Sequence, residues 1–174
     1  MATRASFRFD PNRCTGCDAC ALACTIENGL GLGSTWRQVL HFNLRRHPAA
    51  PAFHLSLGCN HCAEPACLRA CPAGAYRVDG STGAVLLDTG RCIGCRYCTW
   101  ACPYDAPRFD AARGVVTKCT FCVERLRAGG APACASLCPT GALGFERLAD
   151  LEIRQEMEGF PARALRPALS IVPL

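Results

Sequence analysis

Sixteen cysteines stand in four groups of four along this 174-residue chain, and no cysteine lies outside these groups. The first and third groups have the spacing C-x2-C-x2-C-x3-C, whereas the middle gap lengthens to four residues in the second group and to eleven in the fourth. A proline follows the last cysteine of the second, third and fourth groups. The groups are Cys14, Cys17, Cys20, Cys24; Cys59, Cys62, Cys67, Cys71; Cys92, Cys95, Cys98, Cys102; and Cys119, Cys122, Cys134, Cys138.

This spacing is typical of ferredoxins that hold two cubane clusters, in which the fourth cysteine of each run binds the other cluster. At four thiolates per cluster, the sixteen cysteines predict four [4Fe-4S] clusters with none left over. Gly16 and Gly94 lie inside the tight loops, where a positive φ is easily tolerated. Clusters in so short a chain must lie close together, so the sequence predicts a carrier of single electrons.

Two other uses of cysteine fit less well. Disulfides are rare in reducing compartments, and residues 1–12 have neither an apolar signal region nor a twin-arginine pair. Four-cysteine zinc sites use two well-separated pairs of cysteines, whereas each group here has four cysteines close together, which is more than a tetrahedral ion needs from one segment. A zinc-stabilised interaction module therefore stays as the alternative from a different class, and metal analysis separates it from an iron–sulfur protein.

Composition and charge agree with buried clusters. Cysteine, glycine and proline supply 16, 16 and 12 residues, which leaves little material for an ordinary apolar core. The chain without iron is therefore expected to be largely unfolded. Each cluster with its thiolates adds about −2, which changes the formal charge from +5 to about −3. We expect no nucleic-acid partner. The chain contains no run of 18 apolar residues, so no membrane span is expected.

Short strands are expected between the groups. The patterns predict two hairpins, pairing of the segment after the last group with the start of the chain, one further strand, a helix, and an extended tail. The two hairpins are Tyr76–Val78 with Ala84–Leu87 and Arg108–Asp110 with Val115–Thr117. The segment Ala142–Phe145 is expected to pair with Phe7–Phe9, and the further strand lies within Trp36–Leu44. The helix is Glu146–Glu158, and the tail is Phe160–Leu174. The tail is interpreted as an arm on a partner subunit, with packing on its own domain as the alternative.

At these motifs the chain resembles the iron–sulfur subunit of the dimethyl sulfoxide reductase and polysulfide reductase family. The segments are RCTGCDACALAC, CNHCAEPACLRACPAGA, CIGCRYCTWACPYDAPRF and KCTFCVERLRAGGAPACASLCPTGAL. The resemblance implies an α+β fold of two ferredoxin-like units related by a pseudo-twofold. It places residues 1–24 with 118–145 in one unit and 56–117 in the other, with a connecting insertion at 25–55 and a helix and partner-contacting tail at 146–174.

The same resemblance implies which cysteines share a cluster. One set is Cys14, Cys17, Cys20 and Cys138, and a second is Cys119, Cys122, Cys134 and Cys24. The third is Cys59, Cys62, Cys67 and Cys102, and the fourth is Cys92, Cys95, Cys98 and Cys71. All sixteen positions are cysteine, so four [4Fe-4S] clusters and no [3Fe-4S] cluster are expected.

Subunits of this family relay electrons between a quinone-linked membrane anchor and a molybdenum- or tungsten-pterin catalytic subunit. The resemblance thus implies a non-catalytic, peripheral membrane-associated subunit made in the cytoplasm. A soluble polyferredoxin that serves a hydrogenase or formate-lyase complex is the alternative. No nucleophilic triad, phosphate-binding loop or dinucleotide fingerprint appears, so no substrate chemistry is expected of this subunit alone.

Several residues near the cysteines have two interpretations. The four histidines are expected to be packing or surface residues, although an N–H to sulfur contact is plausible for His61. Arg96, Lys118 and Arg125 either raise cluster potentials or face solvent, and the sequence does not separate these roles. Tyr97, Trp100 and Phe121 are expected to shield clusters inside the core.

Overall fold

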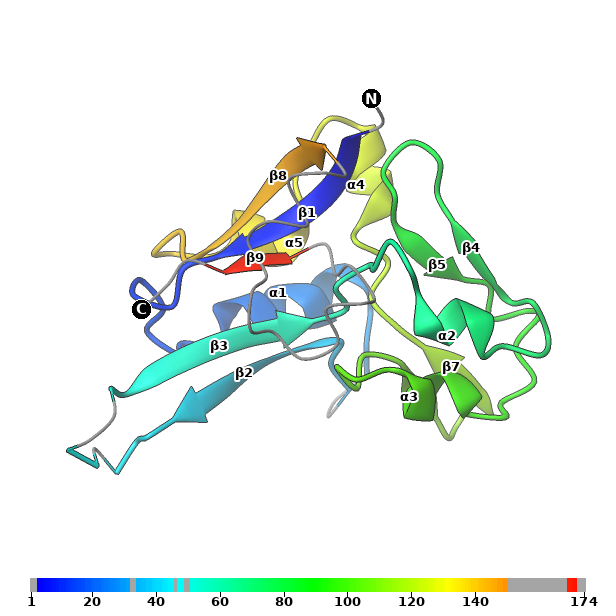
Figure 1. Cartoon of the computed structure of the whole chain (residues 1–174), viewed down its shortest axis with the longest axis horizontal. Coiled ribbons are helices and arrows are strands. Elements are labelled where there is room, and N and C mark those ends of the chain that lie inside the picture. Colours follow the sequence, from blue (N-terminus) through cyan, green and yellow to red (C-terminus); the bar gives the residue numbers. More distant parts are fainter. Residues whose placement is uncertain (1–2, 32–33, 46, 49–50, 150–168, 172–174) are drawn as a thin grey trace.

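The computed structural model describes residues 3–31, 34–45, 47–48, 51–149 and 169–171 (Figure 1). Short helices and strands are mixed along them, as expected for an α+β fold. The strands form one three-stranded sheet and three separate hairpins. The elements divide into two groups in Figure 1, with β1, β8, β9, α1 and α5 on one side and α2, α3, β4, β5 and β7 on the other.

The first group is built on a sheet that joins the two ends of the chain. Strand β1 (Thr3–Phe9) pairs antiparallel with β8 (Leu143–Ala149), so that Phe7 lies opposite Phe145, which confirms the predicted pairing. Phe7 and Phe9 of β1 are fully buried. Helices α1 (Ala19–Glu27) and α5 (Ala133–Ser136) contact each other on one side of this sheet (Figure 1). The first and last cysteine groups therefore meet.

One expectation for the end of the chain was wrong where the structure describes it, and for the tail the structure shows the alternative over three residues. Residues 146–149 continue strand β8 instead of starting a helix, because β8 pairs with β1 over seven positions and these are the last four of them. Strand β9 (Leu169–Ile171) pairs in parallel with β1, so this part of the tail packs on its own domain, with Leu169 buried. The rest of the predicted helix and tail lies outside the described residues.

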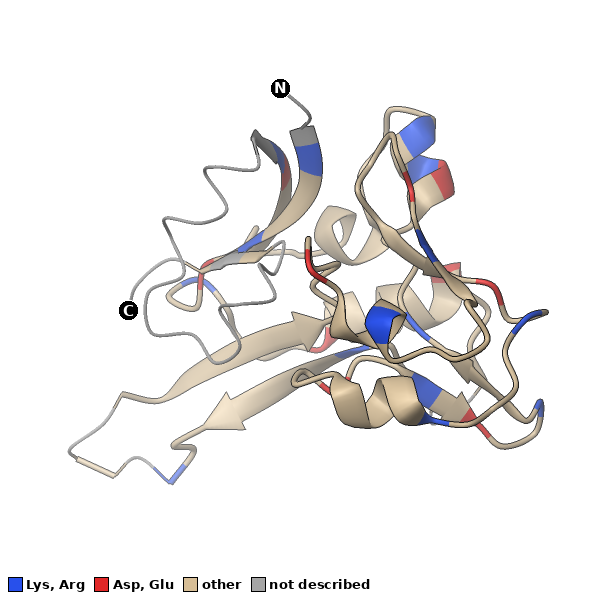
Figure 2. Cartoon of the chain, turned by 45° about the vertical axis from the view of Figure 1, so that its right-hand side comes forward, with Lys and Arg blue, Asp and Glu red and all other residues tan. Residues whose placement is uncertain are grey.

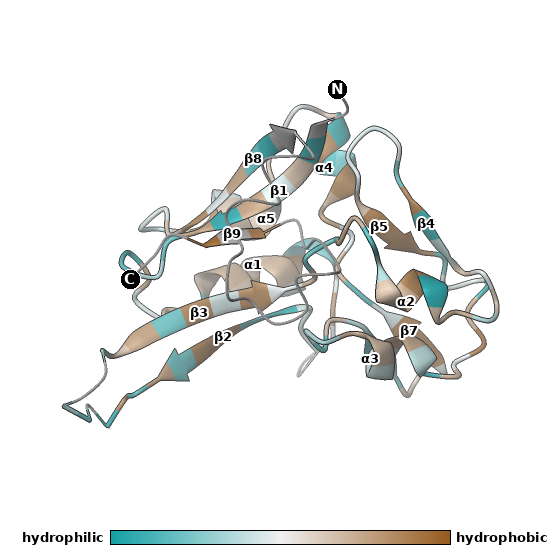
Figure 3. Cartoon of the chain, in the orientation of Figure 1, coloured by the Kyte–Doolittle hydropathy of each residue, from teal (hydrophilic) through white to brown (hydrophobic). Residues whose placement is uncertain are grey.

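The second group contains two hairpins and two short helices. Strands β4 (Tyr76–Val78) and β5 (Val85–Leu87) form one hairpin, and β6 (Arg108–Asp110) with β7 (Val115–Thr117) the other, as predicted. Val85 and Val116 are each 1% exposed, and the hydropathy colours of Figure 3 show β5 as strongly apolar. Helices α2 (Ala66–Arg69) and α3 (Tyr97–Ala101) contact each other and bring the second and third cysteine groups together.

A third hairpin occupies the interval between the first two cysteine groups. Strand β2 (Arg37–Phe42) falls within the predicted segment, but its partner β3 (Phe53–Gly58) was not predicted. The hairpin extends away from the other elements in Figure 1, while its inner end carries the buried side chains of Arg37 and Ser56. Lysine and arginine are spread over several separate elements in the view of Figure 2.

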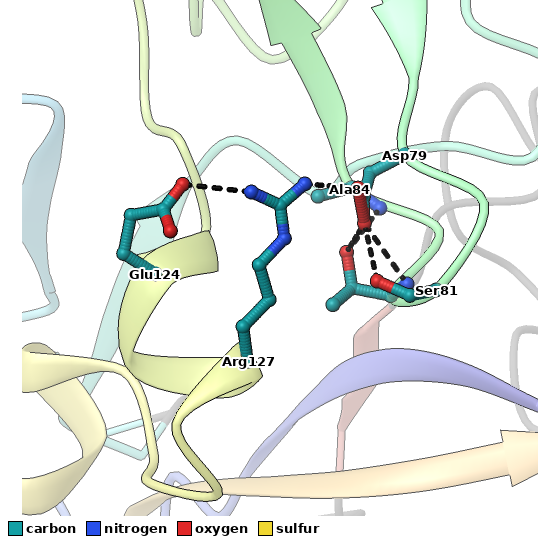
Figure 4. A network of polar contacts seen from close by, with 6 residues as sticks. Asp79, Ser81, Ala84, Glu124 and Arg127 are labelled. Atoms are coloured by element: carbon teal, nitrogen blue, oxygen red, sulfur yellow. Dashed lines mark hydrogen bonds and ion pairs between the residues drawn. The ribbon is translucent and has the colours of Figure 1, made fainter.

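The tip of the β4–β5 hairpin is joined to helix α4 (Val123–Arg127) by a polar network (Figure 4). Asp79 is 5% exposed and accepts hydrogen bonds from Ser81 Oγ at 2.7 Å and Thr82 Oγ1 at 2.9 Å. Its other oxygen accepts from Arg127 Nη2 at 2.7 Å, and Arg127 Nη1 donates to Glu124 at 2.8 Å. The hydrogen bonds from Ser81, Arg127 and Thr82 outweigh burial and hold the pKa of Asp79 well below its usual range.

Asp79→Asn is expected to lower the free energy of unfolding by about 1–3 kcal/mol at pH 7, because Arg127 and the hairpin tip lose a charged acceptor. A carboxylate with a depressed pKa stabilises the fold above its unfolded pKa and loses that effect as the pH falls. The difference from wild type is therefore expected to shrink below about pH 4. Thermal unfolding of the anaerobic protein measures it. Glu124→Gln, which alters an exposed partner of the same arginine, is the control and is expected to cost less than about 1 kcal/mol.

Candidate iron–sulfur cluster sites

All four cysteine loops share one backbone feature. The residue directly before the second cysteine has a positive φ in each group: +70° at Gly16, +69° at Gly94, +40° at His61 and +59° at Phe121. At Gly94 a Cβ atom would lie 2.3 Å from the carbonyl oxygen of Gly114, so only glycine fits there. The prediction for the two glycines is confirmed, whereas the left-handed His61 and Phe121 were not anticipated.

The sulfurs of the first and fourth cysteine groups lie close enough to interact electrostatically. Burial, with repulsion from Cys20, Cys138 and Cys17, raises the pKa of Cys14. Burial followed by repulsion from Cys134 raises the pKa of Cys24 to about 11, and Cys122 also contributes. Helix α1 carries Cys20 and Cys24, and its contact with α5 places Cys134 beside them.

The sulfurs of the second and third cysteine groups also interact electrostatically with one another. Burial, then repulsion from Cys59, Cys102 and Cys67, raises the pKa of Cys62 to about 12. Burial also raises the pKa of Cys98, with repulsion from Cys92 and Cys71. Cys102 therefore lies near Cys59, Cys62 and Cys67, and Cys71 lies near Cys98.

One cavity shows this arrangement directly. Its wall contains Cys59, Cys62, Cys67 and Cys102, together with His61 and Lys118. Nε2 of His61 is buried and has no hydrogen-bond partner among the described residues. Four thiols and an unpaired N–H around one apolar cavity fit a group that carries sulfur acceptors, as a [4Fe-4S] cluster does.

The cysteine sulfurs also accept hydrogen bonds from the backbone. Ala75 N donates to Cys71 Sγ and Leu143 N to Cys138 Sγ, both at 3.4 Å. Val116 N donates to Cys92 Sγ at 3.4 Å, and Phe121 N to Cys119 Sγ at 3.3 Å. Such bonds favour thiolates, which are the form that binds iron. Burial raises the pKa values of other cysteines, among them Cys62 and Cys67, so binding of iron to these thiols must release protons.

The cysteine side chains stand apart from one another in the structure. All sixteen cysteines are free. Within the described residues, no three side chains of histidine, cysteine, aspartate or glutamate converge closely enough to hold one metal ion. Zinc requires its sulfurs at about 2.3 Å from a single centre. A cubane spreads four ligands over four irons, so its ligands stand farther apart.

Two cations are buried among the cysteines. Lys118 is 3% exposed and interacts with the charges of Cys67, Cys102 and Cys119, so the solvent-facing interpretation was wrong for this residue. Arg37 is 4% exposed, and the sequence analysis missed it. Burial lowers the pKa of Arg37, but the thiolates, led by Cys134, outweigh burial and raise it overall.

The guanidinium of Arg37 is held in place by hydrogen bonds to Ser56 and by a contact with the ring of Phe7. Its Nη1 donates to Ser56 Oγ at 3.0 Å, and its Cζ lies 4.4 Å from the ring centre of Phe7. Ser56 Oγ in turn lies 3.2 Å from Cys20 Sγ. No local motif marks Arg37, because its burial depends on pairing of β2 with the unpredicted β3.

Other residues near the cysteines lie farther out than expected. Phe121 is fully buried, as predicted, but Tyr97 and Trp100 are 52% and 79% exposed, so they do not shield a cluster inside the core. Arg96 is exposed above the ring of Phe109, and Arg125 pairs with Glu27 at 3.1 Å.

Two of the remaining histidines lie against the first cysteine loop, since a Cβ atom at Gly16 would be 2.9 Å from the ring of His54 and 3.0 Å from that of His41. His41 and His54 face each other across the outer hairpin, with 2.8 Å between their Nδ1 atoms, and His47 is exposed in its loop. Among the helices that the structure describes, none has the length and apolar character needed to cross a bilayer.

Comparison with known proteins gives the same assignment. Residues 51–148 match the 4Fe-4S dicluster domain, and residues 7–26 match the 4Fe-4S binding domain. The B subunit of the anaerobic dimethyl sulfoxide reductase of Haemophilus influenzae is 40% identical over 85% of this chain and 76% of its own length. The corresponding subunit of Escherichia coli is 39% identical, over 87% and 77%.

A third relative is named for electron transfer. The thiosulfate reductase electron transfer subunit PhsB of Salmonella typhi is 41% identical over 84% of this chain and 77% of its own length. With the cysteine arrangement above, these matches show that the protein belongs to the family of iron–sulfur, electron-transfer subunits that includes the B subunit of dimethyl sulfoxide reductase.

Proposed function

We propose that the protein relays electrons one at a time through four [4Fe-4S] clusters as the non-catalytic subunit of a molybdenum- or tungsten-pterin oxidoreductase. The observation that carries this proposal is the set of sixteen free cysteines, whose interacting partners come from paired groups. The proposed ligand sets are Cys14, Cys17, Cys20, Cys138; Cys119, Cys122, Cys134, Cys24; Cys59, Cys62, Cys67, Cys102; and Cys92, Cys95, Cys98, Cys71.

Each cluster would supply reversible one-electron transfer. The polypeptide's own part is to hold the thiolates, to exclude water from them and to compensate their charge. Buried Arg37 faces sulfurs of the first two sets, and buried Lys118 faces sulfurs of the second and third. Cys119 of the second set interacts with Cys59 of the third, which supports a route for electrons between the two halves.

The proposed architecture has two ferredoxin-like units. Residues 1–24 with 118–145 form one, residues 56–117 form the other, and residues 25–55 connect them. The contacts of α1 with α5 and of α2 with α3 support this division, because each joins two cysteine groups within one unit. The equivalent left-handed positions in the four loops support a pseudo-twofold between the units.

The proposed partners are a pterin-containing catalytic subunit and a quinone-linked membrane anchor. The names of the relatives support the first, since they are subunits of dimethyl sulfoxide, thiosulfate and tetrathionate reductases. A peripheral position at the membrane follows if an anchor is present. The alternative, a soluble polyferredoxin, would contain the same clusters but would serve a different partner.

Purification of the tagged protein under anaerobic conditions, from solubilised membranes and from the soluble fraction, tests this proposal. We expect a much larger subunit to co-purify, with molybdenum or tungsten and pterin in about one copy per complex. Recovery of an iron-loaded free monomer from both fractions would contradict the proposed partners and favour the polyferredoxin.

A further inference from the structure

A pair of stacked rings lies between the second and fourth cysteine groups. His61 and Phe121 occupy the position where the first and third groups have Gly16 and Gly94. Their ring centres are 4.7 Å apart, their planes differ by 12°, and the two residues are 1% and 0% exposed. A bulky residue with a positive φ is strained, and such strain is concentrated at functional positions. The strain at these two positions therefore raises the question of what the rings contribute to the neighbouring cluster sites.

The imidazole of His61 has a defined orientation. Its Nδ1 accepts a hydrogen bond from Val85 N at 3.0 Å, so the proton of the neutral ring lies on Nε2. That Nε2–H group is buried without an acceptor among the described residues, although buried donors are nearly always paired. His61 lines the cavity that also contains Cys59, Cys62, Cys67 and Cys102.

Lys118 completes the same wall. Its Nζ donates to the carbonyl oxygens of Val85 and of Cys119, the latter at 2.7 Å. The peptide groups of Val85 thus anchor both residues, through N–H for His61 and C=O for Lys118. The ammonium group interacts with sulfurs of the second and third ligand sets, which places a fixed positive charge between two proposed clusters.

We propose that His61 and Lys118 are positioning residues that raise the reduction potential of the cluster held by Cys59, Cys62, Cys67 and Cys102. His61 donates its Nε2–H to a sulfur of this cluster, and Lys118 supplies a positive charge at close range. Uptake of one electron from a neighbouring cluster makes the site more negative by one charge. Hydrogen bonds and positive charge both favour that state. This inference rests on the proposed cluster sites and does not depend on the identity of the partner subunits.

Redox titration of the iron-loaded protein, followed by electron paramagnetic resonance, tests the proposal. His61→Phe keeps a stacking ring and removes the donor, while Lys118→Met keeps the length of the side chain and removes the charge. Each is expected to disfavour reduction of one cluster at least tenfold, a shift of about 59 mV to lower potential. Lys118→Arg is expected to stay near the wild-type potential.

Arg113→Met is the matched control. Arg113 is exposed in the surface groove that also reaches Lys118, and its substitution is expected to shift no potential. Unchanged midpoints in His61→Phe and Lys118→Met, at full iron content, would overturn the proposal and leave the proposed function intact. If His61→Phe fails to retain its clusters, equal midpoints in Lys118→Met and Lys118→Arg would overturn it.

Discussion

Protein reconstituted anaerobically is expected to contain about sixteen iron and sixteen sulfide ions per polypeptide, four of each per cluster. Removal of iron by a chelator is expected to unfold it. The physical reason is that cysteines are part of each hydrophobic cluster of the described residues: Cys20 and Cys134 in one, Cys67 and Cys98 in another, and Cys59 and Cys119 in the third. Without clusters these thiols would surround space that no side chain fills, so cluster binding contributes directly to folding.

Iron and acid-labile sulfide analysis, with circular dichroism before and after chelation, measures both effects. About twelve irons in a fully folded protein would contradict the count of four clusters. A folded, colourless protein that contains zinc would contradict the iron–sulfur assignment as a whole. Addition of zinc to the chelated protein is the control, and we expect it not to restore the native spectrum.

Serine substitution at the last cysteine of a group is expected to damage the cluster of the paired group. Cys102→Ser should therefore alter the same paramagnetic signal as Cys67→Ser, and Cys71→Ser the same signal as Cys98→Ser. In the structure Cys102 repels Cys62 and lines the cavity of the second group, although it follows Cys98 in the sequence. Loss of one thiolate ligand is expected to convert the cluster to a three-iron form or to remove it, which lowers the iron content by about one to four per polypeptide.

Redox-poised electron paramagnetic resonance spectra of the four variants measure this effect. The pair Cys102 and Cys67 and the pair Cys71 and Cys98 serve as controls for each other, because each pair takes one cysteine from the second group and one from the third. If Cys102→Ser and Cys98→Ser altered the same signal, each group would hold its own cluster and the proposed ligand sets would be wrong.

Local sequence was sufficient for the two hairpins whose strands are joined by short turns. The β4–β5 and β6–β7 hairpins follow from strand-forming residues on either side of a short turn. Pairing of β1 with β8 was also predicted, but β8 continues through a segment that has a helical pattern, since an available strand edge outweighs weak helical preference. Strand β9 pairs with β1 at the other end of the chain, and β3 pairs with β2 across a longer connection than those of the two predicted hairpins.

The candidate site divides in the same manner. By itself the sequence determined that sixteen cysteines recur with cluster-binding spacing and that Gly16 and Gly94 turn their loops, because both depend on residues a few positions apart. Only the tertiary structure decided that Lys118, Arg37 and His61 are buried among the sulfurs, and that Trp100 is not. Burial and charge compensation depend on which distant segments pack together. A lysine beside a cysteine has the same local sequence whether it faces water or the interior of the protein.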